Sequence, residues 1–222
     1  MHSTYAIQRL QQDGGTHLKR KFAVLYNEAL RVIYAGQDLI LQAPNILSSP
    51  ETLHKATRHL HTWICVAPNA YSGATSLAEG QWVGMYSLDG PLETGQSSFF
   101  DTDTATTASS LWVTRRMYVQ EEHRNKETIL GLQQALEAHI RKYHGDVGSG
   151  AGRAKLRMFA KEGSAAFAFH CASAQKVREL EYGKVLEEGG TMQRLPGGLV
   201  EAMSDQVLTG PWGALFEMHI DL

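Results

Sequence analysis

The stretch from 111 to 145 constrains the fold more than any other part of the chain. Residues 111–119 (LWVTRRMYV) are rich in β-branched and aromatic side chains, which predicts a strand. The strand runs directly into a segment where aliphatic residues recur at spacings of three and four, the pattern of an amphipathic helix. These residues are Ile129, Leu132, Leu136 and Ile140. We therefore predict a strand at 111–119 and a helix at 126–143, with Gly145 as a left-handed stop.

The residues before this pair predict a strand, two helices and an antiparallel pair of strands. The ranges are 5–10 for the first strand, 16–32 and 50–60 for the helices, and 62–67 and 81–88 for the strand pair. The apolar face of the first helix is Phe22, Leu25, Ala29 and Val32. Ser49-Pro50-Glu51 gives the second helix an N-cap, a first-turn proline and an early acid. Gly90-Pro91 is expected to end the last strand with a turn, and 93–108 is a long Thr-rich loop.

Two assignments are open for the residues after the Gly-rich segment 145–152. Either 155–160 is a strand followed by a helix from about Ser164, or 153–162 is helical and 165–171 is a strand. We favour the second, because Phe167, Phe169 and Cys171 alternate and Ser173 would then cap a helix ending at Gly183. A short helix at 199–208 and a terminal strand at 214–222 complete the order.

The composition is that of an ordinary globular protein. Its 222 residues contain no repeat or low-complexity linker, so we predict a single domain at 1–222. Twenty-one Lys and Arg against 23 Asp and Glu give a net charge of −2 without charged blocks, which argues against nucleic acid or membranes as partners. No signal peptide or membrane span is visible. We expect Cys65 and Cys171 to be buried, reduced thiols in a cytoplasmic protein, and no histidine spacing predicts a metal site.

The order of elements resembles that of the GNAT acyltransferases. WVGMYSLDGPL (82–92) looks like the third strand of that family, YVQEEHRNKETILGLQQAL (118–136) like its coenzyme-binding motif, and ALFEMHIDL (214–222) like its last strand. The resemblance implies an α/β (α+β) fold: a mixed, mostly antiparallel central sheet splayed into a V and flanked by helices. It also implies acetyl-CoA or another acyl-CoA as co-substrate.

The coenzyme motif depends on a helix N-terminus whose free N–H groups and positive dipole end meet a pyrophosphate. In family members the motif consists of Arg or Gln, any two residues, Gly, any one residue, and then Gly or Ala. Arg124 keeps the first position, whereas Glu127 and Ile129 replace the two small residues. Glu127 adds bulk and a like charge where phosphate would approach, and it also stabilises the first turn. The resemblance places the coenzyme on Met117, Tyr118, Val119, Arg124, Asn125, Lys126, Glu127, Thr128 and Ile129.

Four residues are candidates for proton transfer. Glu121 and Glu122 follow the 111–119 strand where the sheet would splay, so that either could act as base or lie on the surface. His170 lies in a small, apolar run (AAFAFHCAS) and is either a general acid or base or a satisfied core histidine. The resemblance implies a tyrosine acid on the helix after the fifth strand, for which Tyr182 is the candidate.

The candidates for acceptor binding are Arg115, Arg116 and Trp82. Because neighbouring strand residues face opposite sides, we expect only one of the two arginines to point toward the acceptor, where it would favour an anionic group.

These residues support three hypotheses. The first is an acyltransferase that moves an acyl group from acyl-CoA to the amine of a small molecule. The second is a GNAT-fold enzyme that no longer uses coenzyme A and performs another acid/base reaction, such as cyclisation, isomerisation or decarboxylation. The third is a binding module, with homodimers formed through an exposed C-terminal edge strand.

Overall fold

A computed structural model describes residues 5–11, 14–33, 50–92, 111–148, 152–161, 165–181 and 211–222. The strands are β1 (Ala6–Arg9), β2 (His61–Ala67), β3 (Gln81–Leu92), β4 (Leu111–Val119), β5 (Arg153–Lys161), β6 (Gln175–Glu181) and β7 (Pro211–Asp221). The helices are α1 (Thr16–Ile33), α3 (Pro50–Thr57), α4 (Lys126–Asp146), α5 (Ala165–Ser173) and the short 3-10 helix η2 (Glu121–His123). The predicted strand at 111–119 and the helix that follows it are confirmed.

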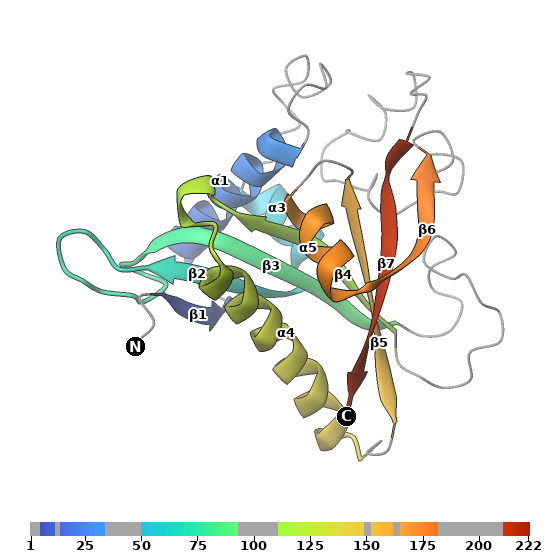
Figure 1. Cartoon of the computed structure of the whole chain (residues 1–222). Coiled ribbons are helices and arrows are strands. Elements are labelled where there is room, and N and C mark those ends of the chain that lie inside the picture. Colours follow the sequence, from blue (N-terminus) through green and yellow to red (C-terminus); the bar gives the residue numbers. More distant parts are fainter. Residues whose placement is uncertain are drawn as a thin grey trace.

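The described strands form one mixed sheet in the order β1-β2-β3-β4-β5-β7-β6 (Figure 1). Every neighbouring pair is antiparallel except β4 and β5, which are parallel. The mixed, mostly antiparallel sheet that the family resemblance implies is therefore confirmed. The terminal strand β7 lies between β5 and β6, so the predicted edge at the C-terminus is wrong.

The sheet opens between its two parallel strands. β4 and β5 are in register only from Leu111–Lys155 to Val113–Arg157. Beyond Val113, β4 continues to Val119 beside β3 alone, and β5 continues to Lys161 beside β7. The two arms of the sheet therefore diverge toward the carboxyl ends of β4 and β5, which is the predicted V.

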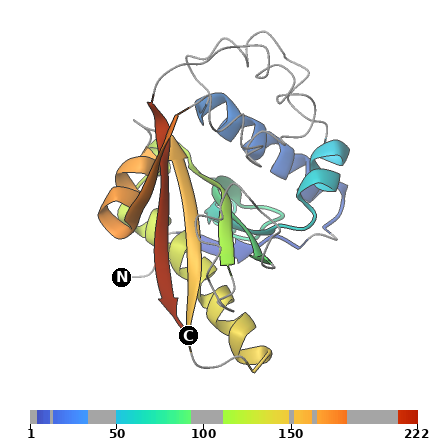
Figure 2. The same cartoon turned by 90° about the vertical axis from the view of Figure 1, so that its right-hand side faces the viewer.

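Helices cover both faces of this sheet. Leu132, Leu136 and Ile140 of α4 are buried against it, and Phe167 of α5 packs against Phe216 of β7. On the other face, Phe22, Leu25 and Ala29 of α1 are buried as predicted. Val32, which the sequence assigns to the same apolar face, is 49 % exposed, so its assignment is wrong. Figure 2 shows α5 on one side of the strands and α1 with α3 on the other.

The preferred assignment of 153–171 is wrong and the alternative is correct. Residues 153–161 form β5, in which Ala154, Leu156 and Met158 are buried on one face. Residues 165–173 form α5, and the predicted helix up to Gly183 is replaced by β6 at 175–181. The run AAFAFHCAS is apolar throughout, so its periodicity cannot separate helix from strand, and its four alanines favour the helix.

The ends of two elements, which the sequence places at glycine residues, also differ from the prediction. α4 continues past Gly145 to Asp146, and Gly148 has the positive φ, at 67°. β3 runs through the cis Gly90-Pro91 bond to Leu92 instead of ending before it. The predicted loop at 93–108 and helix at 199–208 lie outside the described residues. None of the described helices is long and apolar enough to cross a membrane.

Candidate functional site

A β-bulge at Arg115 changes which side chains of β4 face each layer. Ser87 pairs with Arg116 and Leu88 with Thr114, so Arg115 is one extra residue opposite β3. Before the bulge, Trp112 faces α4 and donates from Nε1 to His144 Nε2 at 3.3 Å. After it, the even-numbered side chains of β4 face α1 instead.

Both neighbouring arginines consequently lie on the α1 face, so the alternation that the sequence predicts for Arg115 and Arg116 does not hold at the bulge. Arg115 donates from Nε and Nη2 to Asp89 Oδ2, the former at 2.9 Å. Arg116 is 8 % exposed, with its guanidinium over the Tyr26 ring of α1 at 5.3 Å and Nη2 3.5 Å from the Tyr26 hydroxyl. The bulge thus gathers positive charge on one face of β4 where the arms begin to part.

A carboxylate from α1 meets the end of β4. The Tyr118 hydroxyl donates to Glu28 Oε1 at 2.8 Å, and Gln120 Nε2 donates to both Glu28 oxygens at 3.2 and 3.1 Å. Burial and the hydrogen bond to Glu28 raise the pKa of Tyr118, so the phenol stays protonated. Glu28 was not among the residues predicted from the sequence. It lies three residues after Leu25, on the apolar face of α1, and this spacing could have indicated an acidic side chain that faces the sheet.

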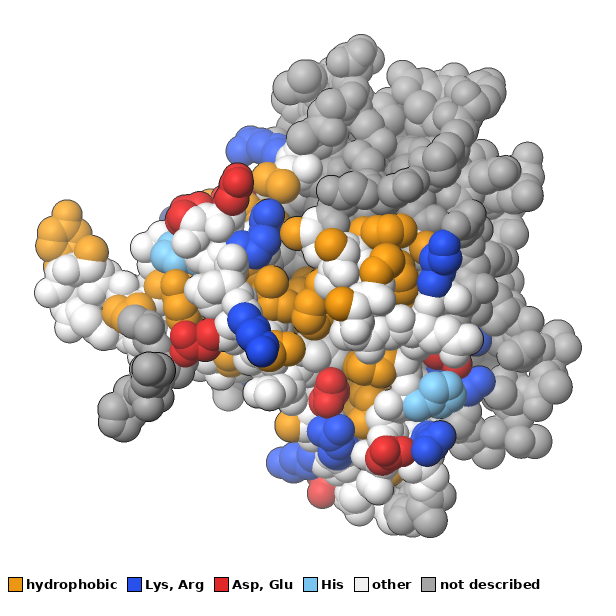
Figure 3. Space-filling view, in the orientation of Figure 1, with side chains coloured by type: hydrophobic (Ala, Val, Ile, Leu, Met, Phe, Trp, Pro, Cys, Tyr) orange, Lys and Arg blue, Asp and Glu red, His pale blue; other side chains and the backbone are white. Residues whose placement is uncertain are grey.

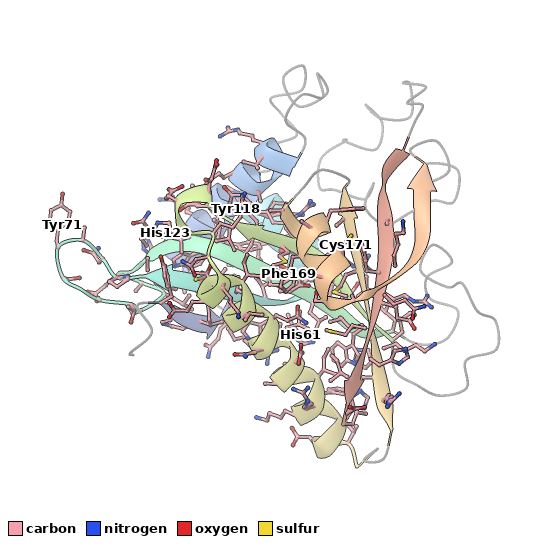
Figure 4. The ribbon with its side chains drawn as sticks, viewed as in Figure 1. His61, Tyr71, Tyr118, His123, Phe169 and Cys171 are labelled. Atoms are coloured by element: carbon pink, nitrogen blue, oxygen red, sulfur yellow. The ribbon has the colours of Figure 1, made fainter. Side chains whose placement is uncertain are left out.

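The two predicted bases of the following turn lie apart from this cluster. Glu121 and Glu122 are exposed in η2, and no hydrogen bond of either side chain occurs among the described residues. His123 Nδ1 instead lies 3.1 Å from the Tyr5 hydroxyl, on the β1 side of the turn. In Figure 4 Tyr118 lies beside α1, and His123 lies at the turn before α4.

The N-terminus of α4 is closed by its own side chains. Asn125 is the N-cap: its Oδ1 accepts from the Thr128 N–H at 3.0 Å, and Thr128 Oγ1 accepts from the Asn125 N–H at 3.3 Å. Arg124 Nη2 donates to the Val119 carbonyl at 3.1 Å, which ties the turn to the end of β4. Lys126 and Glu127 are exposed. One of the N–H groups that a phosphate would use is therefore already occupied.

An apolar surface lies between α4 and α5. Met117, Ile129 and Phe167 are partly buried against the core below them. Figure 3 shows hydrophobic side chains gathered over the face that carries these two helices, with Lys and Arg side chains beside them. This surface adjoins the α4 N-terminus. An elongated ligand that bound here would contact the helix end with one part and the apolar surface with the next.

His170 is buried on the inner side of α5. It is 1 % exposed, its ring centroid lies 5.6 Å from that of Phe216, and its Nδ1 has no hydrogen-bond partner among the described residues. Burial lowers its pKa to about 4, so the imidazole is neutral at pH 7. Cys65 is buried as expected, whereas Cys171 is exposed, contrary to expectation.

Trp82 has a structural environment. It is 6 % exposed, its Nε1 donates to the Leu77 carbonyl at 2.8 Å, and Lys21 Nζ lies 5.1 Å from its ring centroid. These contacts hold the β2–β3 hairpin, whose tip residue Tyr71 is fully exposed (Figure 4). The structure does not bring Trp82 together with Glu28 or His170.

Tyr182 lies outside the described residues. Within the described ranges, no group of three or more His, Cys, Asp or Glu residues could hold a metal ion.

Comparisons with known proteins show which solved structures this fold resembles. No protein-family model and no curated protein sequence matches the chain. It is nevertheless similar over nearly its whole length to solved N-acetyltransferases. An N-acetyltransferase from Staphylococcus aureus Mu50 is 11 % identical, with a TM-score of 0.53, covering 99 % of this chain and 100 % of that one.

Two further structures agree. PaiA N-acetyltransferase from Thermoplasma acidophilum, in complex with coenzyme A, is 13 % identical with a TM-score of 0.52, over 97 % of this chain and 98 % of that one. Ribosomal-protein-alanine N-acetyltransferase from Brucella melitensis is 16 % identical with a TM-score of 0.51, over 98 % and 99 %. At such identities the likeness concerns the fold, and the chain has the GNAT fold.

Proposed function

Because the chain has the GNAT fold, we propose that it is an N-acyltransferase that moves an acetyl or other acyl group from acyl-CoA to the amine of a small-molecule acceptor. The observation that carries this proposal is the loss of β4–β5 pairing after Val113, beside the N-terminus of α4. The edge of β4 from 114 to 119 that β5 leaves offers backbone groups to an extended ligand. The fold alone does not decide the activity, so the proposed reaction is argued from individual residues.

The α4 turn supplies the binding site for the coenzyme diphosphate. Lys126 and Arg124 are exposed cations at the helix N-terminus, where backbone N–H groups and the helix dipole favour an anion. The Asn125 side chain must rotate away to release the Thr128 N–H, which is an exchange of one hydrogen bond for another. The apolar surface between α4 and α5 takes the uncharged arm of the coenzyme.

The acceptor approaches from the α1 face, where Glu28 takes the proton of its ammonium group. Glu28 is half-buried and held by Tyr118 and Gln120, so the carboxylate is oriented before substrate binds. The neutral amine nitrogen then bonds to the acyl carbon and the carbon–sulfur bond breaks. The sulfur takes up the second proton of that nitrogen, so the transfer is balanced.

His170 donates a hydrogen bond to the departing sulfur. It lies on α5, the helix that follows β5, which is the helix that carries the acid in the family resembled. With a pKa lowered to about 4, the imidazole is a weak base at pH 7, so a neutral N–H donor is the role that its burial favours. Glu121, Glu122 and Trp82 have no part in this scheme.

Calorimetric titration with acetyl-CoA tests the proposal, followed by a thiol-release assay with a panel of primary amines. Binding in the micromolar range and amine-dependent release of coenzyme thiol are expected. Binding without transfer to any amine would contradict the acyltransferase assignment. Native mass spectrometry of the purified chain adds a check for coenzyme that co-purifies.

A second function is favoured by the closed α4 N-terminus. Glu127 stands in place of the glycine, and the Asn125–Thr128 capping box already satisfies the helix end, as it would in a protein that has lost its coenzyme. The same fold would then perform another acid/base reaction with Glu28 or His170. Absence of any thermal stabilisation at millimolar acetyl-CoA, together with a co-purifying metabolite, would favour this alternative.

A further inference from the structure

The side-chain amide of Gln120 is hydrogen-bonded at one end and lacks a partner at the other. Its Nε2 donates to Glu28 Oε2 at 3.1 Å and to Glu28 Oε1 at 3.2 Å. An ionised carboxylate only accepts hydrogen bonds, so the NH2 end of the amide must face Glu28 and the oxygen must point away. That oxygen, Gln120 Oε1, is buried and has no hydrogen-bond partner within the described part of the chain.

The position of this amide is fixed by the backbone of Gln120 as well as by Glu28. The Gln120 N–H donates to the Val83 carbonyl at 2.8 Å, and the Gln120 carbonyl accepts from the His123 N–H at 3.0 Å. The side-chain oxygen therefore cannot turn toward another donor unless the hydrogen bonds to Glu28 break. Because a buried carbonyl without a donor is uncommon in folded proteins, a ligand that donates to it would remove an unfavourable feature of the site.

Glu28 has an accepting position within reach of the same ligand atom. Its Oε1 accepts from the Tyr118 hydroxyl and from Gln120, whereas Oε2 accepts from Gln120 alone among the described residues. The nitrogen and oxygen of one amide are about 2.2 Å apart, so Gln120 Oε1 lies no more than about 5.3 Å from Glu28 Oε2. A nitrogen that donates over about 2.9 Å in two directions can therefore bridge the two oxygens.

The protons of a primary ammonium group match the acceptors of the proposed reaction. One of its three protons passes to Glu28, and a second is taken up by the sulfur when the carbon–sulfur bond breaks. The third stays on the nitrogen and becomes the N–H of the product amide. Gln120 Oε1 can accept from this retained N–H from substrate binding to product. A secondary ammonium group has two protons, both of which must leave, so it has none for Gln120.

We propose that Gln120 Oε1 binds the retained N–H of the acceptor, so that the site selects primary amines over N-alkylated amines. An N-alkyl group would stand where the retained hydrogen points, which leaves the Gln120 carbonyl unsatisfied and places a carbon atom against it. A site built to hydrogen-bond a substrate N–H rejects analogues that lack it. This inference rests on the proposed function, since it specifies the acceptor of the same reaction.

Steady-state acetylation of benzylamine and N-methylbenzylamine tests the inference, because the two amines differ by one methyl group on the nitrogen. We expect kcat/KM to be about thirtyfold higher for benzylamine. Gln120→Met should lower kcat for both amines, because Glu28 loses a donor, and should reduce their ratio to about threefold. Gln81→Met, exposed at the start of β3, should change neither the rates nor the ratio. A ratio that Gln120→Met leaves unchanged, or a preference of the unsubstituted chain for N-methylbenzylamine, would overturn the inference.

Binding separates this inference from the proposed activity. The side-chain amide NMR signals of Gln120 are followed in the unsubstituted chain while methylammonium or tetramethylammonium chloride is added without acyl-CoA. Tetramethylammonium has the same charge but no N–H, so we expect methylammonium to shift these signals more. Such a difference in a chain that acetylates no amine supports the primary-amine site and contradicts the proposed function. Equal shifts in a chain that acetylates amines keep the activity and remove Gln120 from acceptor binding.

Discussion

The hydroxyl of Tyr118 donates a 2.8 Å hydrogen bond to Glu28 Oε1, which joins the end of β4 to α1. Gln120 adds hydrogen bonds to both oxygens of the same carboxylate. The position of this carboxylate is therefore defined by two residues that directly precede the α4 turn. An oriented carboxylate at the end of a strand that diverges from its neighbour is well placed to receive the proton of an acceptor amine.

Replacement of Glu28 by Gln should lower kcat about a hundredfold while it preserves the fold, because the amide oxygen still accepts from Tyr118. The loss should be partly recovered at high pH, where more of the amine is already neutral. Acyl-transfer rates between pH 6 and 9 measure both effects. Glu79→Gln, in the exposed β2–β3 hairpin, is the control. Unchanged kcat in Glu28→Gln would exclude Glu28 as the base.

Sequence periodicity predicted the part of the fold that positions the opening. The β-branched and aromatic residues of β4 and the three-four spacing of the apolar residues of α4 are visible without tertiary context. The assignment failed at α5, whose residues are apolar all round. The signal that could have corrected it was in β5, where Lys155 and Arg157 alternate with Leu156 and Met158.

The site was less accessible to sequence reasoning than the fold. A bulge at Arg115 shifts register by one residue, and no local pattern distinguishes it from an unbroken strand. Glu28 and Tyr118 are 90 residues apart in the chain, so only the packing of α1 on β4 brings them together. Glu121 and Glu122 follow β4 at the point where the sheet opens, as the sequence predicts, yet both side chains are exposed.

Lys21 should be required for the stability of the β2–β3 hairpin. Its ammonium donates to the carbonyls of Leu77 at 3.0 Å and Gly80 at 2.8 Å, and it lies over the Trp82 ring. Lys21→Met keeps the aliphatic stem but removes these hydrogen bonds, which should cost about 1–3 kcal/mol of unfolding free energy. Urea denaturation measures the loss. Arg20→Met, on the exposed side of the same helix, should cost less than 0.5 kcal/mol or so.

Acid should destabilise the chain through its buried and half-buried imidazoles. Burial is the main cause that lowers the pKa of His139 to about 4, with contributions from His61, Arg9 and Lys142, and burial also lowers the pKa of His61, His144 and His170. His139 lies in an aromatic cluster, with ring centroids 4.5 Å from His61 and 5.2 Å from Trp63. In the unfolded chain these imidazoles take up protons near pH 6.5.

The unfolded state therefore binds more protons than the folded state between pH 6.5 and about 4, and stability should be full above 6.5 and fall as the pH drops through this window. His139→Phe fills the same space without a titrating group, so its urea midpoint should fall less between pH 7.5 and 5. His17→Gln, on the exposed face of α1, provides the comparison. The same fall in His139→Phe as in the unsubstituted chain would mean that His139 is not a source of the acid sensitivity.

Glu127 should oppose coenzyme binding and support α4 at the same time. Its carboxylate is exposed in the first turn, where it interacts favourably with the helix dipole and unfavourably with any phosphate bound there. Glu127→Ala should tighten acetyl-CoA binding about fivefold at low ionic strength, and the gain should shrink in 0.5 M salt because exposed charges are screened. Unfolding free energy should fall by about 0.3–1 kcal/mol in the same variant.

These opposite signs distinguish a direct charge effect at the diphosphate site from a general change in the fold. Calorimetric titration at two salt concentrations gives the affinities, and urea denaturation gives the stability. Glu79→Ala removes an acidic charge of the same size from the β2–β3 hairpin and should change neither quantity at the α4 turn. If Glu127→Ala binds acetyl-CoA no more tightly at low salt, Glu127 does not border the diphosphate, and the α4 N-terminus loses its place in the proposed coenzyme site.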